Sequence, residues 1–122
     1  MAIKNFRDKV VVITGAGSGM GRAYALEFGV LGAKLALNDY DAESLDETNR
    51  LLGEVGNRDT LIKAFDVSDK EAVYRFADSV KERFGNAHVV INNAGIEGSV
   101  EPVYHTDEVD FKRVMDVNYF GV

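Results

Sequence analysis

The feature that most constrains the fold is a glycine-rich run that directly follows an apolar segment. Residues 10–13 read Val-Val-Val-Ile, and residues 14–21 read Thr-Gly-Ala-Gly-Ser-Gly-Met-Gly before a helix-like stretch begins. Glycine lets the backbone turn with positive φ and lets a ligand approach the main chain without meeting a Cβ. The helix that follows offers unpaired N–H groups and the positive end of its dipole. The sequence therefore predicts a strand, a turn and a helix start that together cradle a diphosphate.

The spacing of the glycines narrows the class of site. They stand at positions 15, 17, 19 and 21 in the pattern T-G-x-x-x-G-x-G, and no register gives G-x-G-x-x-G. A P-loop is excluded because no Gly-Lys-Ser/Thr closes the turn. Two alternatives stay open, since a glycine-rich turn also serves plain loop geometry and residues 15–19 also fit the G-x-G-x-G loop of an S-adenosylmethionine methyltransferase.

An acidic residue at the end of the next apolar segment favours one kind of dinucleotide. Residues 34–38 form a short apolar-rich run that leads to Asp39, eighteen positions after Gly21. A carboxylate there accepts hydrogen bonds from the adenosine ribose diol. It also repels a 2′-phosphate, by about 4 kcal/mol per charge pair at ~4 Å and an effective dielectric of ~20. Asp39 therefore predicts NAD rather than NADP, and it also suits the N-terminal end of a helix.

Composition excludes several classes of protein. The chain has 122 residues, of which 46% are hydrophobic and 28% charged, as in an ordinary globular domain. A net charge of −6 argues against nucleic acid and anionic membranes as partners. The lack of cysteine excludes disulfides and thiolate chemistry, and two histidines far apart predict no metal site. The N-terminus is too polar for a signal peptide and no stretch spans a bilayer, so a cytoplasmic location is expected.

The order of the segments predicts the fold class. Strand-like runs alternate with helical periodicity, which indicates an α/β fold: a Rossmann-like doubly wound parallel sheet with strand order 3-2-1-4. It is expected to form a single NAD(P)-binding domain over residues 1–122 that is truncated at its C-terminus. Strands are expected at 10–13, 34–39, 60–65 and 88–91, and helices at 19–31, 41–55, from a capping box at Ser68 and Glu71 to Gly85, and from Thr106 onward.

The predicted fourth strand raises an alternative function. With residues 96–105 expected to form a loop, this strand would be an apolar edge, and such edges pair with other chains. A non-catalytic, nucleotide-binding or self-associating module is therefore a second interpretation, and a homo-oligomer is expected.

Polar residues stand at two further positions where packing alone does not require them. The run Asn92-Asn93-Ala94-Gly95 follows the fourth strand, and ligands of open α/β sheets bind beyond such strand ends. Asn118 lies on the apolar face of the last predicted helix. Because a buried amide without partners costs roughly 1–3 kcal/mol, Asn118 is either a structural hydrogen-bonding residue or part of a site.

Taken in order, T-G-x-x-x-G-x-G, Asp39, Asp66-Val67, Asn92–Gly95 and Asn118 resemble the short-chain dehydrogenase/reductase family along essentially the whole chain. The resemblance implies an NAD-dependent oxidoreductase that transfers hydride to or from a small alcohol or carbonyl substrate. It implies that Asn118 is catalytic and holds a water in a proton relay. It also implies a set of coenzyme-binding residues that runs from the diphosphate through the adenosine to the nicotinamide: Gly15, Ser18, Gly19, Met20, Gly21, Asp39, Tyr40, Asp66, Val67, Asn93, Ala94 and Gly95.

One departure from the family concerns catalysis. The general acid/base of the family is a tyrosine with a lysine four residues later. None of the five tyrosines, at positions 24, 40, 74, 104 and 119, is followed by a lysine at that distance. Asn118 does not replace the pair, because an amide does not titrate. The chain therefore looks like the cofactor-binding N-terminal portion of a dehydrogenase, expected to be inactive alone and to bind dinucleotide weakly at best.

Overall fold

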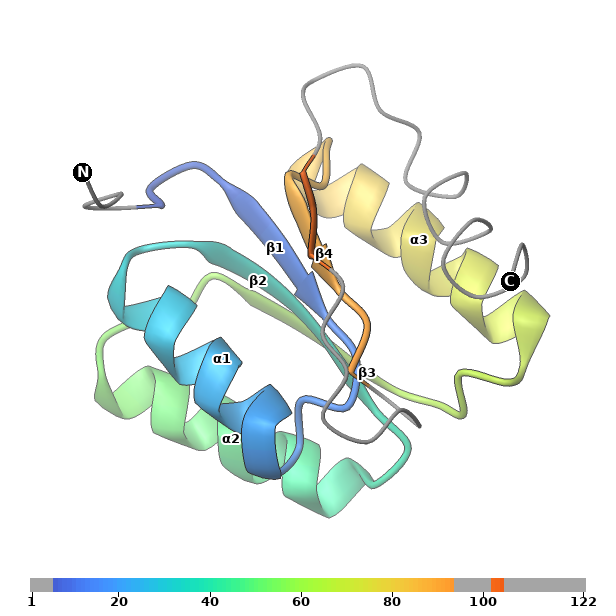
Figure 1. Cartoon of the computed structure of the whole chain (residues 1–122), viewed down its shortest axis with the longest axis horizontal. Coiled ribbons are helices and arrows are strands. Elements are labelled where there is room, and N and C mark those ends of the chain that lie inside the picture. The colour runs from blue at the N-terminus through green and yellow to red at the C-terminus, as the bar shows by residue number, and fades with distance from the viewer. Residues whose placement is uncertain (1–5, 94–101, 105–122) are drawn as a thin grey trace.

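The computed structural model describes residues 6–93 and 102–104, which form a sheet covered by helices on both faces (Figure 1). The strand order is β3-β2-β1-β4-β5. Helices α1 and α2 cover one face and α3 covers the other. The predicted α/β fold and its 3-2-1-4 strand order are therefore confirmed. The strands are β1 (Val10–Ile13), β2 (Lys34–Asp39), β3 (Thr60–Ala64), β4 (Val89–Ile91) and β5 (Pro102–Tyr104), and the helices are α1 (Gly19–Val30), α2 (Ala42–Glu54) and α3 (Lys70–Phe84).

Strand β1 divides the hydrophobic core into two halves. It pairs in parallel with β2 on one side and β4 on the other. All four of its residues are buried, and successive side chains point to opposite faces. Val10 and Val12 join the cluster under α3, whereas Val11 and Ile13 join the cluster under α1 and α2. A strand buried on both faces needs an unbroken apolar run, which is what residues 10–13 supply.

The starts of α2 and α3 depend on aspartate caps. Asp41 accepts hydrogen bonds from the backbone N–H groups of Glu43 and Ser44. The hydroxyl and then the backbone N–H of Ser44, with a smaller contribution from Glu43, hold the pKa of Asp41 below its usual range. At α3 the cap is Asp69, which accepts from the N–H of Ala72 at 3.1 Å.

The predicted capping box at α3 is wrong. The Ser68 hydroxyl donates to the carboxylate of Asp66 at 2.8 Å instead of capping the helix. The Ser68 backbone N–H donates to the same carboxylate at 2.9 Å. Because this turn occupies Ser68, the cap moves one residue along, and Glu71 stands at the second position of the helix instead of the third.

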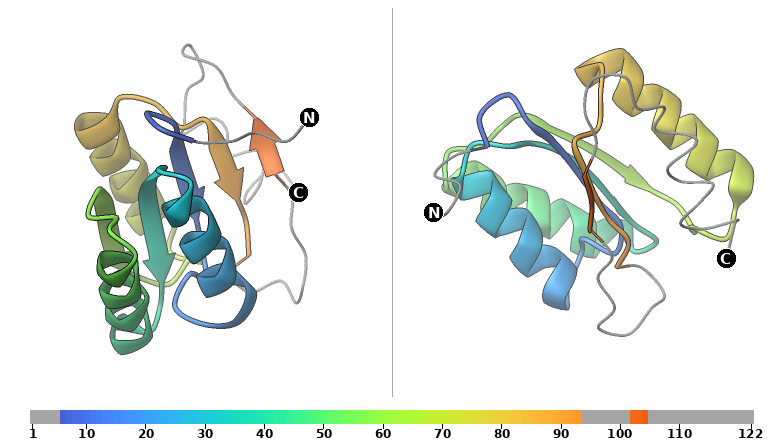
Figure 2. Two further views of the ribbon diagram at one scale, coloured as in Figure 1. Left: turned by 90° about the vertical axis from the view of Figure 1, so that its left-hand side faces the viewer. Right: turned by 45° about the horizontal axis from the view of Figure 1, so that its top comes forward.

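The loop expected at residues 96–105 is corrected at residues 102–104, and so is the open edge of β4. Strand β5 pairs antiparallel with β4, with Val89 opposite Tyr104 and Ile91 opposite Pro102 (Figure 2). Proline suits the first residue of a strand, where its missing N–H costs little. Strand β5 closes the β4 edge, which is one of the two grounds for the self-association alternative; the other, the last predicted helix, lies outside the described residues.

No helix in the described ranges combines the length and the apolar character that crossing a bilayer requires.

Candidate functional site

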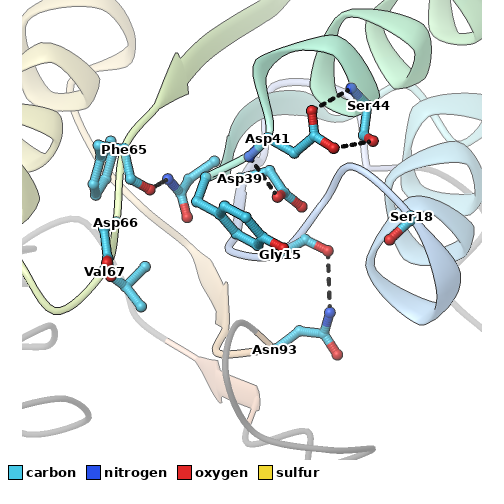
Figure 3. Close-up of a pocket in the computed structure, with 11 residues that line it drawn as sticks. Gly15, Ser18, Asp39, Asp41, Ser44, Phe65, Asp66, Val67 and Asn93 are labelled. Carbon is cyan, nitrogen blue, oxygen red and sulfur yellow. Dashed lines mark hydrogen bonds between the residues drawn. The ribbon is translucent and has the colours of Figure 1, made fainter.

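A cavity of about 310 Å³ lies beyond the carboxyl ends of the strands, beside the turn that leads into α1 (Figure 3). This is the edge of an open α/β sheet at which ligands bind. The residues that line it come from the glycine turn and from the ends of β2, β3 and β4: Gly15, Ser18, Asn38, Asp39, Tyr40, Asp41, Ser44, Phe65, Asp66, Val67 and Asn93.

The glycine turn requires glycine for two different reasons. Gly15 and Gly19 have φ angles of +66° and +55°, which side chains rarely tolerate. Gly21 is needed for packing, since a Cβ there would lie 1.9 Å from the Gly15 carbonyl oxygen and 2.8 Å from the Asn93 Nδ2. The first turn of α1 therefore rests directly on the backbone of the turn that precedes it.

The N-terminus of α1 has no side-chain cap, in contrast to α2 and α3. Its N-cap residue, Ser18, is extended with φ −157° and ψ 171°, and its hydroxyl makes no capping hydrogen bond. The first turn of α1 also carries no acidic side chain. The leading N–H groups of a helix have no partner inside the helix. An uncapped N-terminus at the rim of a cavity is therefore suited to bind an anion.

Asp39 is held at the end of β2 by two backbone donors. Its Oδ2 accepts from the N–H of Gly17 at 2.8 Å, and its Oδ1 accepts from the N–H of Asp41 at 3.0 Å. The residue is only 7% exposed. Because each carboxylate oxygen can accept two hydrogen bonds, both oxygens keep capacity for a ligand hydroxyl. The two backbone hydrogen bonds fix the orientation of the carboxylate, and therefore the direction from which a ligand hydroxyl can donate to it.

The far side of the cavity combines a carboxylate with apolar side chains. Phe65, Asp66 and Val67 follow β3, and the Phe65 carbonyl accepts from the Asn38 Nδ2 at 2.9 Å (Figure 3). The backbone N–H and then the hydroxyl of Ser68 hold the pKa of Asp66 below its usual range. Tyr40 lines the same cavity and is 83% exposed. The arrangement suits a flat ring that also carries hydrogen-bonding groups.

Asn93 joins the end of β4 to the glycine turn. Its backbone N–H donates to the Thr14 Oγ1 at 3.1 Å, and its Nδ2 donates to the Gly15 carbonyl at 3.1 Å. The neighbouring Asn92 is buried, and its side-chain oxygen and nitrogen have no hydrogen-bond partner among the described residues. Asn93 therefore holds the turn with the same side chain that lines the cavity.

The structure brings most of the predicted coenzyme-binding residues to one place. Gly19, Met20 and Gly21 form the first turn of α1. Ala94, Gly95 and Asn118 lie outside the described residues. In the described part of the chain, no three possible metal ligands come together. The predicted residues that line the cavity are Gly15, Ser18, Asp39, Tyr40, Asp66, Val67 and Asn93.

Sequence reasoning missed several residues of the cavity. Asn38, Asp41, Ser44 and Phe65 also line it. The sequence indicates them only through their positions, because they lie at the end of β2, just after β3 and at the start of α2. Gly17 was also not assigned, although a Cβ there would lie 2.8 Å from the Asp39 Oδ2. The alternation of glycines is the signal for that close approach.

The chain is similar to known proteins in both sequence and fold. Residues 9–122 match the family described as short chain dehydrogenase. Epidermal retinol dehydrogenase 2 of Mus musculus is 48% identical over 116 residues, a match that covers 95% of this chain and 37% of that protein. The chain spans less than half the length of the curated relatives it matches.

Two solved structures show the likeness in fold. A short-chain dehydrogenase/reductase from Burkholderia phymatum in complex with NAD has a TM-score of 0.67 at 41% identity, covering 72% of this chain and 31% of that chain. A metagenomic short-chain oxidoreductase in complex with NADP has a TM-score of 0.70 at 35% identity, covering 75% and 41%. The two neighbours thus contain different coenzymes.

Proposed function

The chain belongs to the short-chain dehydrogenase/reductase family of oxidoreductases, and we propose that its cavity binds the adenosine diphosphate portion of NAD. When bound, the coenzyme would supply a nicotinamide able to accept a hydride from an alcohol carbon or to donate one to a carbonyl carbon. Because the chain spans less than half of its curated relatives, the reaction and its small-molecule substrate are proposed for the protein as a whole. We also propose that it works as a homo-oligomer in the cytoplasm.

The observation that carries the proposal is the uncapped start of α1 beside the glycine-rich turn. Hydrogen bonds to a charged group are each worth about 1.5–3 kcal/mol, whereas the helix dipole contributes about 0.3–1 kcal/mol. The N–H groups at the start of α1, more than the dipole, are therefore expected to hold the diphosphate. Ser18, Gly19 and Met20 are the residues proposed for this contact, with Gly15 and Gly21 giving the phosphates room.

Asp39 supports a preference for NAD. The carboxylate is oriented by the N–H groups of Gly17 and Asp41, and each oxygen keeps capacity for the ribose diol. Among the described residues that line the cavity, none is a lysine or an arginine, while Asp39 and Asp41 both carry carboxylates. A 2′-phosphate would therefore meet negative charge, with no cation among the described residues that line the cavity.

The remaining roles are assigned along the length of the coenzyme. Asp66, Val67 and Tyr40 are proposed to surround the adenine, through the Asp66 carboxylate, the backbone of Val67 and the ring of Tyr40. Asn93, Ala94 and Gly95 are proposed to lie by the second ribose and the nicotinamide. Asn118 is proposed to hold a water of the proton relay. Since the 122 residues hold no tyrosine with a lysine four residues later, we propose that they do not turn over substrate alone.

Calorimetric titration of the protein with NAD, NADP and S-adenosylmethionine tests the proposal. We expect NAD to bind about tenfold or more tightly than NADP, which corresponds to about 1.4 kcal/mol left after solvent screening of the 2′-phosphate repulsion. Equal affinities for NAD and NADP would refute the preference. Binding of S-adenosylmethionine in place of either dinucleotide would refute the assigned ligand class.

A further inference from the structure

Two carbonyl groups of the glycine turn are held by side chains of α1 and α2. The Ala16 carbonyl accepts a hydrogen bond from the Thr48 Oγ1 at 2.8 Å, and the Gly17 carbonyl accepts one from the Arg22 guanidinium at 2.6 Å. The N–H groups of the same two residues are bonded to the end of β2, at the Asn38 carbonyl and the Asp39 carboxylate. All four backbone polar groups of Ala16 and Gly17 are therefore occupied.

Arg22 connects three parts of the site. Besides the Gly17 carbonyl, its guanidinium donates to the Ser44 carbonyl at 3.2 Å, and its Nε donates to the Thr48 Oγ1 at 2.9 Å. Thr48 is fully buried and Arg22 is half-buried. Holding a long side chain in one rotamer costs up to about 2 kcal/mol of conformational entropy. Three charge-assisted hydrogen bonds, to Gly17, Ser44 and Thr48, offset that cost.

A peptide group is planar, so fixing its carbonyl also fixes the N–H of the next residue. The Gly17 carbonyl and the Ser18 N–H belong to one trans peptide and point in opposite directions. By holding the Gly17 carbonyl, Arg22 therefore directs the Ser18 N–H away from itself. This peptide rotates about ψ of Gly17 and φ of Ser18, and glycine restricts its own ψ less than other residues because it has no Cβ.

We propose that Arg22 is a positioning residue for coenzyme binding, acting through the Gly17 carbonyl on the N–H groups that face the diphosphate. This inference rests on the proposed function. Without the guanidinium, the Gly17–Ser18 peptide samples more than one orientation. The affinity for a diphosphate is then reduced in proportion to the fraction of molecules that keep the binding-competent orientation. Adenosine lacks a diphosphate and uses Asp39, which the Asp41 N–H still holds.

The test compares Arg22→Met with Arg50→Met by calorimetry with NAD and with adenosine. Arg50 is an exposed arginine of α2 that pairs with Glu47 and Glu54, so its substitution removes the same charge without touching the turn. We expect Arg22→Met to lower NAD affinity about tenfold and to leave adenosine affinity within about twofold. Arg50→Met is expected to change neither. Thermal melts of both variants establish that they fold.

Two further variants keep the proposal testable if Arg22→Met does not fold. In Arg22→Lys a single ammonium replaces the guanidinium that now donates to Gly17, Ser44 and Thr48. We therefore expect a smaller loss of NAD affinity, about threefold. Thr48→Val keeps the shape but removes the hydroxyl bonded to both Ala16 and Arg22, and it should lower NAD affinity more than adenosine affinity.

The results distinguish a failure of the role proposed for Arg22 from a failure of the proposed NAD binding. A folded Arg22→Met or Arg22→Lys protein that binds NAD as the unsubstituted protein does would overturn the role of Arg22. So would an equal loss of NAD and adenosine affinity, because that pattern indicates general destabilisation of the site. If the unsubstituted protein binds adenosine but gains nothing from the diphosphate of NAD, the proposed function itself fails.

Discussion

Replacing Gly21 by alanine is expected to reduce the affinity for NAD by about a hundredfold, close to 3 kcal/mol. The added Cβ would lie 1.9 Å from the Gly15 carbonyl oxygen and 2.7 Å from the Gly15 carbonyl carbon. Both atoms belong to the backbone of the turn, so no side-chain rotation relieves the overlap. The first turn of α1 must move away from the glycine turn, and the N–H groups proposed for the diphosphate move with it. Calorimetric titration with NAD measures the loss.

A second glycine of the same helix provides the control for Gly21. A Cβ at Gly29 would lie 2.4 Å from the Leu52 Cδ2, which is the end of a side chain. Overpacking of this kind costs about 1–3 kcal/mol of stability. Gly29→Ala is therefore expected to lower the melting temperature and to leave NAD affinity unchanged in the folded protein. A Gly21→Ala protein that binds NAD normally would show that the contact between α1 and the turn does not shape the site.

The second large effect is expected for Asp39→Asn, with about a thirtyfold loss of NAD affinity and no remaining preference over NADP. The asparagine has the same shape, but an amide nitrogen replaces one of the two oxygens that now accept from Gly17 and Asp41. In either orientation one backbone donor faces another donor. A lost hydrogen bond to a charged group costs about 1.5–3 kcal/mol, which sets the size of the effect. Removing the charge also removes the repulsion of a 2′-phosphate.

Asp46→Asn is the matched control for this substitution. Asp46 is an exposed residue of α2, so its replacement changes the net charge equally and leaves the cavity intact. We expect both coenzyme affinities to stay unchanged. The assignment of Asp39 fails if Asp39→Asn still binds NAD more tightly than NADP by the original ratio, as titration with each coenzyme would reveal.

The fold was predictable where the signal is local. Residues 10–13 form a continuous apolar run, and Val73, Phe76, Ala77 and Val80 repeat on one helical face, so both elements follow from periodicity. Strand β5 could not be read in the same way. It has three residues, begins with Pro102, and exists through pairing with β4, which no local pattern encodes. The start of α3 was not predicted correctly because the Ser68 hydroxyl has two possible partners. It donates to the nearby Asp66 carboxylate instead of accepting from an N–H group of the helix.

The candidate site divides along the same line. Gly15, Ser18 and Asp39 were predicted because each belongs to a short motif that can be read without the fold. The bonds that hold the turn were not predicted, because Arg22 and Thr48 meet it only after α1 and α2 pack together. Supporting residues of this kind leave no motif in a single sequence.

The measurement that tests the central claim most directly is a titration of the isotope-labelled protein with NAD, followed through its backbone amide NMR signals. We expect the signals of Ser18, Gly19 and Met20 to move most, because their N–H groups are proposed to bind the diphosphate. Unchanged signals from these three amides, or larger changes around the cavity between β3 and α3 near Arg75 and Ser79, would contradict it.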